Sequence, residues 1–584
     1  RKMLQFMHKH HLIIRVTEQH LAIFNSHSLS IELANKAVNK LSGNEIIKLA
    51  SQLYKSKETD LVFKKIISKH ISLLTSINQY ILNNKKIKSP TIFISKRYRK
   101  IIQGNSELFD TRINVKFEPY WGVLKLKAIW FAIVFGYTLH LLIQPFCRKT
   151  TNKKIFKYAI SIPWSWAVKF KGARDFPFLV DDNSIKNNET VFLVEYQESN
   201  EFYQKYSNAG YNLRQATNVR QIRNLFSRSN LDTRHEFPKI IRLLKANKED
   251  FFIYEVIASM LISRISWSII TSKIKFKNYI YYNKEAATQI AANIFLKKKN
   301  ISVHAYSQFI GGPYQVSGKN SIYDKRNIHW SFLNPNYFYL NNQAMLDSMH
   351  LHYHGSVVFK NIGNIFSEKI LEIKRNIKSI KEIKLNFNIQ NRHKVISIFD
   401  TTYVNISKAY SNYDEAQYFL KDIIKLAKSM PNHKFLLKPS KDNSFFLPKS
   451  SFWAGEKGID IIQLREKFNQ LPNAIILSDN ADVVDIISLS DVVFTNCFSS
   501  PTADALMANV PAFWYQSKTD ISFSPYNKIP GLVINGFENL NTCVNKMLKS
   551  DYDLNFLKNP EFIYLVGDSS KKALTLLREG LSGE

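Results

Sequence analysis

The feature that most constrains the fold is a regular alternation of short apolar runs and longer amphipathic runs between residues 393 and 515. Runs such as VISIF, FLLK and VVFTN have the length and apolar content of buried strands, and helical spacing follows each one. Strands that alternate with helices of this length form βαβ units and a parallel sheet. A similar texture begins near residue 157, in YAISIPW, TVFLVEY, NYIYYN and ISVHAYSQF. The sequence therefore predicts an α/β protein with two Rossmann-like domains facing a cleft.

The stretches around these alternating regions suggest the domain boundaries. Residues 365–393 read as a charged helix without an apolar strand, which is typical of a connection between two domains. We predict a helical accessory region at 1–120, an apolar and basic segment at 121–155, a first Rossmann-like domain at 156–364, a hinge helix at 365–392, a second Rossmann-like domain at 393–545 and C-terminal helices at 546–584.

The charge of the chain restricts its partners. Its 81 Lys and Arg against 47 Asp and Glu give a formal net charge of +34, which favours a polyanionic partner. The basic residues are spread along the whole chain, without zinc-finger spacing, a basic helix or an RNA-binding aromatic signature, so we expect no nucleic-acid partner. Three cysteines without a short-spaced pair indicate neither a disulfide framework nor a zinc site, and a reducing compartment fits best. Because the sequence begins at Arg1, we expect residues to precede it, and no secretory signal is visible.

One apolar segment suggests contact with a membrane. Residues 128–147 carry no formal charge, with Lys125 and Lys127 before them and Arg148 and Lys149 after them. This length is sufficient to span a bilayer, and basic flanks also suit a helix that lies at an anionic surface. Four residues dilute the segment: Tyr137, Thr138, His140 and Gln144. The alternative is a buried helix. We expect a peripheral or single-span protein at the cytoplasmic face of the inner membrane, in contact with its anionic surface.

The loop after the strand at 491–496 is a candidate anion site. The segment TNCFSSPTADALM places Ser499, Ser500 and Thr502 between this strand and a helix that begins near Pro501. Ligands of open parallel sheets bind at the carboxyl ends of the strands, and a helix N-terminus favours a phosphate. The alternative is that these hydroxyls only cap the helix. No GxGxxG fingerprint follows any strand, so nicotinamide chemistry has no support.

A family resemblance extends this interpretation. The segment SDVVFTNCFSSPTADALMANVPAFWY resembles the donor site of GT-B glycosyltransferases, especially bacterial enzymes of surface polysaccharides such as lipopolysaccharide and capsule. Asp504 lies where these enzymes carry an acidic residue. Their Lys-Pro-His-Pro motif is matched by Lys438-Pro439-Ser440, in which serine replaces histidine. The segments NIGNI and VGDSSKKALTLLREGL also resemble the family, and the resemblance covers roughly residues 275–584.

The corresponding segment of the first domain is KNISVHAYSQFIGGPYQ. Related sugar- and polyol-transferring enzymes have a Gln-His-Gly turn after this strand, whereas here Gln308 is followed by Phe309. His304 shares a strand face with Gln308, so it could serve in catalysis, or it could be a buried core residue. Gln308 and the pair Gly311-Gly312 are the expected acceptor-binding residues, because glycine lets the backbone approach a sugar closely.

Carboxylates supply further candidates. Transfer with inversion needs a general base for the acceptor hydroxyl, and Asp181 or Asp182 in RDFPFLVDDNSI is the candidate, although turn chemistry also explains this run. Asp400 and Thr401 follow the strand VISIF and are expected to contact the donor together with Lys438. The resemblance implies catalysis without a metal, and we expect no metal site and no cofactor.

The resemblance implies a glycosyltransferase that moves a sugar from a nucleotide-activated donor to a glycan or lipid-linked acceptor. The Ser-Ser signature slightly favours CMP-type donors over UDP or GDP donors, as in sialyl-, Kdo- and polyol-phosphate transferases. The first domain would bind the acceptor and the second the nucleotide-sugar. The alternatives are a nucleotide-sugar epimerase or polyol-phosphate transferase of the same fold, or a non-catalytic membrane-associated scaffold, which the missing histidines at 309 and 440 would fit.

Overall fold

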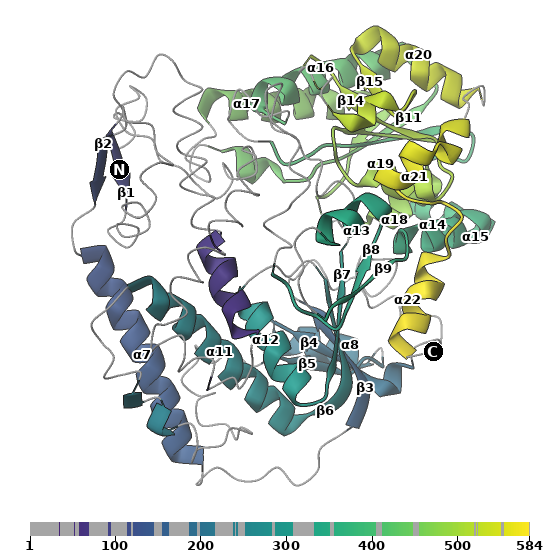
Figure 1. The fold of residues 1–584 in the computed structure, drawn as a ribbon. Helices are drawn as coiled ribbons and strands as arrows, with labels where there is room; N and C mark the ends of the chain where they lie inside the picture. The colour runs from purple at the N-terminus through teal and green to yellow at the C-terminus, as the bar shows by residue number, and fades with distance from the viewer. Residues whose placement is uncertain are drawn as a thin grey trace.

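The computed structural model describes the chain in a series of segments, which are shown as ribbon elements in Figure 1. They are residues 34, 52, 58–68, 91–94, 114–117, 121–144, 155–162, 186–195, 199–208, 210–216, 237–239, 241–242, 251–282, 287–307, 332–350, 356–403, 411–447, 455–479, 481–518, 521, 524–549 and 554–582. The structure does not describe the side chains of residues 91–94, 114–117, 121–130, 251–256, 258–259, 348 and 455–457.

The N-terminal domain is built on a parallel sheet. Within the described segments this sheet has seven strands in the order β5-β4-β3-β6-β7-β8-β9. Their bounds are β3 (Ile155–Ile162), β4 (Thr190–Val194), β5 (Leu213–Gln215), β6 (Lys275–Tyr282), β7 (Ser302–Tyr306), β8 (Tyr337–Leu340) and β9 (Val358–Asn361). Every residue of β4 is buried, as expected for a parallel sheet with helices on both faces.

The C-terminal domain has a second parallel sheet, with six strands in its described part in the order β12-β11-β10-β13-β14-β15. Their bounds are β10 (Val395–Phe399), β11 (Lys434–Lys438), β12 (Ala474–Ile476), β13 (Val492–Asn496), β14 (Ala512–Gln516) and β15 (Val533–Asn535). Three of the interior strands, β10, β13 and β14, are buried along their whole length. The prediction of two Rossmann-like α/β domains is confirmed.

Helices cover both faces of the N-terminal sheet (Figure 1). One face carries α7 (Trp121–Ile143), α11 (Phe251–Lys273) and α12 (Ala287–Lys298), which share one apolar core with it. The helical residues 59–68 join this core, and Glu58 forms an ion pair of 2.7 Å with Lys297. None of the helices in the described segments is both long enough and apolar enough to cross a membrane.

The C-terminal sheet is also a layer between helices. Three helices pack on its outer face: α16 (Tyr413–Ser429), α17 (Gly455–Asn469) and α20 (Phe537–Leu548). Two short helices, α18 (Val483–Leu489) and α19 (Pro501–Met507), pack on the inner face, which looks toward the N-terminal domain in Figure 1. One continuous apolar core contains residues of this inner face and of the N-terminal sheet.

The chain connects the two domains twice. After β9 it passes through α14 (Ile365–Arg375) and α15 (Ile377–Asn386), so the single hinge helix expected here is two helices. Asn376 separates them, because its side chain accepts hydrogen bonds from the first amides of α15. Near its end the chain passes through α21 (Pro560–Leu565) and returns to the N-terminal sheet as α22 (Ala573–Ser582). Glu368 of α14 accepts from the backbone amide of Leu574, which joins the two crossings.

Several elements differ from the sequence-based expectation. The region 1–120 was expected to be helical, and its described part also contains the parallel pair β1 (Thr91–Ile94) and β2 (Asn114–Phe117). Their run of β-branched and aromatic residues, TIFI in β1, favours a strand. The short helices α8 (Asn200–Asn208) and α13 (Gln343–His350), the long helix α11 and the edge strands β5, β9 and β15 were not anticipated.

Candidate functional site

The carboxyl edge of the C-terminal sheet contains a topological switch point. The chain proceeds from β10 outward to β11 and β12, and then returns to the other side of β10 as β13. The register aligns Phe399 of β10 with Lys438 of β11, and Phe399 also with Thr495 of β13, so these three strand ends are level. The loops after β10 and β13 lead to helices on opposite faces of the sheet. Ligands of open α/β sheets bind at such a point.

Asp400 follows β10 and forms a buried ion pair. Its carboxylate lies 2.7 Å from a guanidinium nitrogen of Arg465 on α17, and the two side chains are only 1% and 2% exposed. The backbone amide of Ser440 donates to the same carboxylate. Burial raises the pKa of Asp400, and the Arg465 charge and the Ser440 amide oppose that rise. Asp400 was expected to contact the donor; instead, its bonds fasten the loop after β11 to the end of β10.

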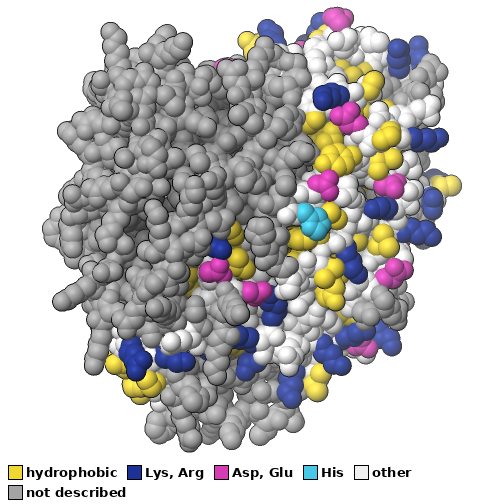
Figure 2. All heavy atoms as spheres, viewed as in Figure 1, with side chains coloured by type: hydrophobic (Ala, Val, Ile, Leu, Met, Phe, Trp, Pro, Cys, Tyr) yellow, Lys and Arg dark blue, Asp and Glu magenta, His cyan; other side chains and the backbone are white. Residues whose placement is uncertain are grey.

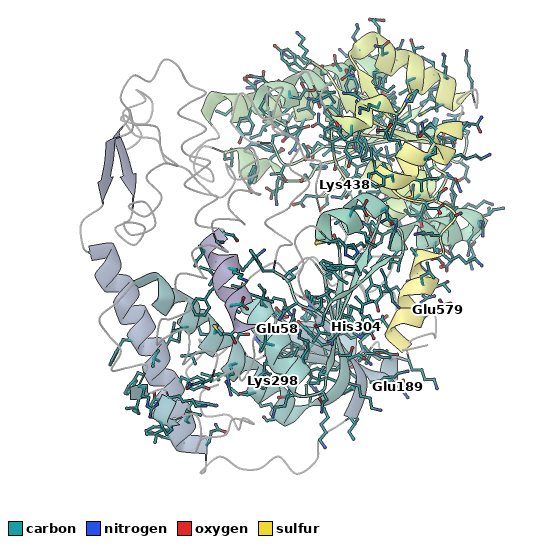
Figure 3. All side chains as sticks on the ribbon, in the orientation of Figure 1. Glu58, Glu189, Lys298, His304, Lys438 and Glu579 are labelled. Atoms are coloured by element: carbon teal, nitrogen blue, oxygen red, sulfur yellow. The ribbon has the colours of Figure 1, made fainter. Side chains whose placement is uncertain are left out.

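The loop after β11 presents the lysine and serine that the sequence singled out. Lys438, the last residue of β11, is half-buried, and its ammonium donates to the backbone carbonyl of Asp479 over 2.8 Å, in the segment after the neighbouring strand β12. The hydroxyls of Ser440 and Thr402 lie 3.0 Å apart in a hydrogen bond, so the loops after β10 and β11 are joined. Thr401, next to Asp400, is also partly exposed. Figure 3 shows Lys438 on the side of its domain that looks toward the N-terminal domain.

The three hydroxyls of the loop after β13 have different environments. Ser499 and Ser500 are partly exposed, and Ser500 precedes α19 without capping it through its side chain. The capping alternative is therefore not what the Ser500 hydroxyl does. Thr502 is fully buried, and its hydroxyl bonds that of Thr495 at 2.8 Å and the carbonyl of Phe513 at 3.1 Å. The expectation that Thr502 faces a phosphate is corrected, because its side chain lies between α19 and the sheet.

Asp504 connects the domains. It is 3% exposed and accepts a hydrogen bond of 2.6 Å from the side-chain amide of Asn364. The other side-chain atom of Asn364 caps α14 by accepting from the amide of Phe366. The resemblance placed Asp504 in the donor site; instead, the structure places its carboxylate at the joint between α19 and the start of α14.

One residue of this edge was missed by sequence reasoning. Asn496 ends β13 and is fully buried, yet neither atom of its side-chain amide has a hydrogen-bond partner among the described residues. A buried amide without partners is unfavourable by about 1–3 kcal/mol for each unpaired group, so this position is suited to a polar ligand. The signal in the sequence was a polar residue at the end of the otherwise apolar strand VVFTN.

His304 lies in the middle of β7, among aromatic side chains. Its ring stacks on those of Tyr337 and Tyr339, with centroids 5.0 and 6.0 Å away. One ring nitrogen lies 3.1 Å from the hydroxyl of Tyr339 and the other 3.3 Å from the amide oxygen of Asn278. Burial, and then the charge of Lys360, lower the pKa of His304 to about 3, so the ring is neutral near pH 7. Figure 3 shows it well apart from Lys438, and its contacts are those of a core residue.

The remaining predicted site residues lie outside the described residues. They are Asp181, Asp182, Gln308, Gly311 and Gly312. The described segments contain no group of three or more His, Cys, Asp or Glu side chains that could hold a metal ion. The structure therefore brings together Asp400, Thr401, Lys438 and Ser440, with Ser499 and Ser500 at the adjacent strand end.

The chain is similar to a known protein family in sequence and to several solved structures in fold. Residues 239–544 match the model of a family described as polysaccharide biosynthesis PFTS motif protein. No curated protein matches the chain in sequence. Among solved structures, UDP-GlcNAc 2-epimerase from Neisseria meningitidis bound to UDP-GlcNAc is 14% identical, with a TM-score of 0.43 over 74% of this chain and 100% of its own. The wall teichoic acid polymerase TagF is 11% identical, with a TM-score of 0.44 over 79% of this chain and 97% of its own.

Proposed function

Because this chain belongs to the polysaccharide biosynthesis PFTS motif family, we propose that it is a GT-B-type glycosyltransferase. It moves a sugar from a nucleotide-activated donor to a glycan or lipid-linked acceptor during polysaccharide synthesis. CMP-activated donors are slightly favoured over UDP and GDP donors because of the Ser-Ser segment at 499–500. The C-terminal domain binds the donor and the N-terminal domain binds the acceptor.

The observation that carries this proposal is the polar edge at the switch point of the C-terminal sheet. Hydroxyls from the ends of three adjacent strands gather there, those of Thr402, Ser440 and the pair Ser499-Ser500. Lys438 adds a positive charge, and the unpaired amide of Asn496 adds a buried donor and acceptor. The bonds of Asp400 to Arg465 and to the Ser440 amide hold the loop after β11 against the end of β10.

This arrangement fits the departure of a nucleotide. As the glycosidic bond breaks, negative charge develops on the phosphate oxygen that leaves with the nucleotide. Preorganised hydroxyl donors and a cation stabilise such a charge more in the transition state than in the ground state. The acceptor hydroxyl must lose its proton as it attacks, and Asp181 or Asp182 of the first domain is the proposed base. The buried contacts of His304 give it a structural role in the N-terminal sheet instead. The proposal includes no metal and no cofactor.

Calorimetric titration of the full chain with CMP, UDP and GDP tests the donor site. We expect saturable binding, tightest for CMP, and binding about tenfold weaker in the Ser499→Ala/Ser500→Ala variant, which loses two polar contacts. The matched control is Thr502→Val, which removes a buried hydroxyl of the same segment. It should bind nucleotide with unchanged affinity but melt at a lower temperature, because its hydrogen bonds are structural.

Measuring turnover of the donor with and without an acceptor distinguishes the alternative functions. A glycosyltransferase releases nucleotide from a nucleotide-sugar only when an acceptor is present, whereas an epimerase converts the donor without an acceptor. A polyol-phosphate transferase would consume a CDP-polyol in place of a nucleotide-sugar. A scaffold would show no saturable binding of any of the three nucleotides, and that result would overturn the proposal.

A further inference from the structure

Helix α7 has two apolar faces, of which the N-terminal domain covers only one. Val134, Tyr137 and Leu141 are buried in the core that α7 shares with α11. On the other side, Phe131, Phe135 and Leu142 are 55%, 56% and 53% exposed. At about 100° per residue these three positions fall within about 40° of one another around the helix axis. They form one exposed stripe, which we call the α7 stripe.

The stripe is more than a scatter of single apolar residues. The rings of Phe131 and Phe135 stack, with centroids 6.3 Å apart and planes 13° apart. Figure 2 shows apolar side chains at the lower left surface, where α7 runs in Figure 1, with Lys and Arg beside them. A contiguous solvent-exposed apolar surface is typical of a site that binds another protein or a membrane.

The sequence around the stripe indicates what it docks on. No charged residue occurs from 128 to 147, and basic residues bracket this segment on both sides: Lys125 and Lys127 before it, and Arg148, Lys149, Lys153 and Lys154 after it. An apolar stripe between basic residues is complementary to an anionic bilayer, whose headgroups attract the cations while its acyl chains accept the apolar side chains. A second copy of the chain would bring the same cations and a net charge of +34 to the contact, which disfavours self-association.

We propose that the α7 stripe lies in the surface of an anionic phospholipid bilayer, with α7 parallel to the membrane plane. The other face of α7 stays packed on α11 in this arrangement, so no part of the domain has to unfold. Binding through the stripe is independent of donor chemistry, and it goes beyond the proposed transferase activity. It would bring the enzyme to the surface where lipid-linked acceptors reside.

Cosedimentation of the full chain with vesicles tests the proposal. One set of vesicles is pure phosphatidylcholine, and the other is equal parts phosphatidylcholine and phosphatidylglycerol. The unchanged chain should sediment with the anionic vesicles only, and less of it should do so in high salt. The variant Phe131→Ser/Phe135→Ser/Leu142→Ser should bind at least about tenfold more weakly, because it loses most of the apolar area that enters the bilayer.

A matched control exists on α15, one of the helices that connect the two domains. Ile377 and Leu385 of α15 are 72% and 74% exposed, and they are also flanked by lysines. The variant Ile377→Ser/Leu385→Ser should bind vesicles like the unchanged chain. Both variants replace exposed side chains, so their melting temperatures should match that of the unchanged chain.

Three results would overturn the proposal. The first is an unchanged chain that binds neither type of vesicle, and the second is a triple variant that binds as tightly as the unchanged chain. The third is an unchanged chain that is dimeric by light scattering and becomes monomeric in the triple variant without vesicle binding in either form. Titration with CMP keeps this test separate from the proposed function, because the triple variant should retain the nucleotide affinity of the unchanged chain.

Discussion

Replacing Arg465 with methionine should destabilise the C-terminal domain strongly. The Asp400 carboxylate and the Arg465 guanidinium are 1% and 2% exposed and 2.7 Å apart, so the substitution leaves a buried carboxylate without its counter-ion. Removing one partner of a buried ion pair typically costs about 3–5 kcal/mol. Arg465 also donates to the carbonyl of Lys441 and the amide oxygen of Asn443, and each lost bond adds about 0.5–1.5 kcal/mol unless water replaces it.

Where water replaces the two lost bonds, the expected loss is therefore about 4 kcal/mol, which is the middle of the range for a broken buried ion pair. For a domain of about 150–250 residues this corresponds to a fall in melting temperature of roughly 8–16 °C. Urea and thermal unfolding, followed by tryptophan fluorescence, measure both quantities. The control is Lys369→Met, because Lys369 pairs with Glu372 at the surface, and its loss should change stability by less than about 0.5 kcal/mol.

A double-mutant cycle makes this prediction specific to the pair. Asn at position 400 can still accept from the Ser440 amide but carries no charge, so Asp400→Asn removes the need for a counter-ion. The double variant Asp400→Asn/Arg465→Met should be at least about 2 kcal/mol more stable than the sum of the two single losses predicts. Additive losses would show that the two side chains do not share an interaction, and would refute the reasoning.

The pH dependence supplies an independent check on the Arg465→Met variant. Without the guanidinium, only the Ser440 amide and the charge of Lys438 still oppose the effect of burial, so the folded-state pKa of Asp400 rises further above the unfolded value of about 3.9. Between these two pKa values the folded state binds more protons than the unfolded state, so stability falls as pH rises. The deficit of Arg465→Met relative to the unchanged chain should therefore shrink on acidification toward pH 4. A deficit that is constant with pH would contradict a buried, unpaired carboxylate.

Three further predictions concern the N-terminal sheet and the interdomain joint. Burial lowers the pKa of His304 to about 3, so only the unfolded state binds a proton at this residue as pH falls below about 6.5. The free energy of unfolding should therefore fall by up to about 1.4 kcal/mol per pH unit on acidification, and urea titrations of His304→Gln should lack this contribution. Gly580→Ala places a methyl group 2.7 Å from the Tyr339 hydroxyl and should lower stability by about 1–3 kcal/mol in thermal melts. Asp504→Ala leaves the buried Asn364 amide unpaired and should lower the free energy of unfolding by about 1–3 kcal/mol in urea titrations. The double variant Asp504→Ala/Asn364→Ala should lose less stability than the sum of the two single losses.

The central strands of both sheets could be predicted from the sequence because they are buried on both faces. Strands such as β10 and β13 are continuous runs of apolar and β-branched residues, and burial on both faces requires such runs. Edge strands have shorter or interrupted runs of apolar residues. β9 has the sequence VFKN and no fully buried residue, so its place in the sheet depends on pairing with β8 and not on its own composition.

The orientation of single side chains at the site could not be predicted in the same way. The motif located the loop after β13, but each step along a helix rotates the side chain by about 100°. Ser500 and Thr502 are two residues apart, and only Thr502 turns into the packing against β13 and β14. Likewise, Asp400 pairs with Arg465, 65 positions later on α17, and no local pattern links the two.

The polar residues of this edge divide into two groups with different physical roles. Asp400, Thr502 and Asp504 are buried, and each is bonded to a group on another element: α17, the sheet and α14. Ser499 and Ser500 lie between these anchored positions and stay partly exposed. In the proposed function this loop receives the phosphate of the donor, and a loop that is already ordered loses less affinity on binding than one that must become ordered. The buried polar residues beside the edge supply this order, so polar residues of one segment can have a structural role and not a binding role.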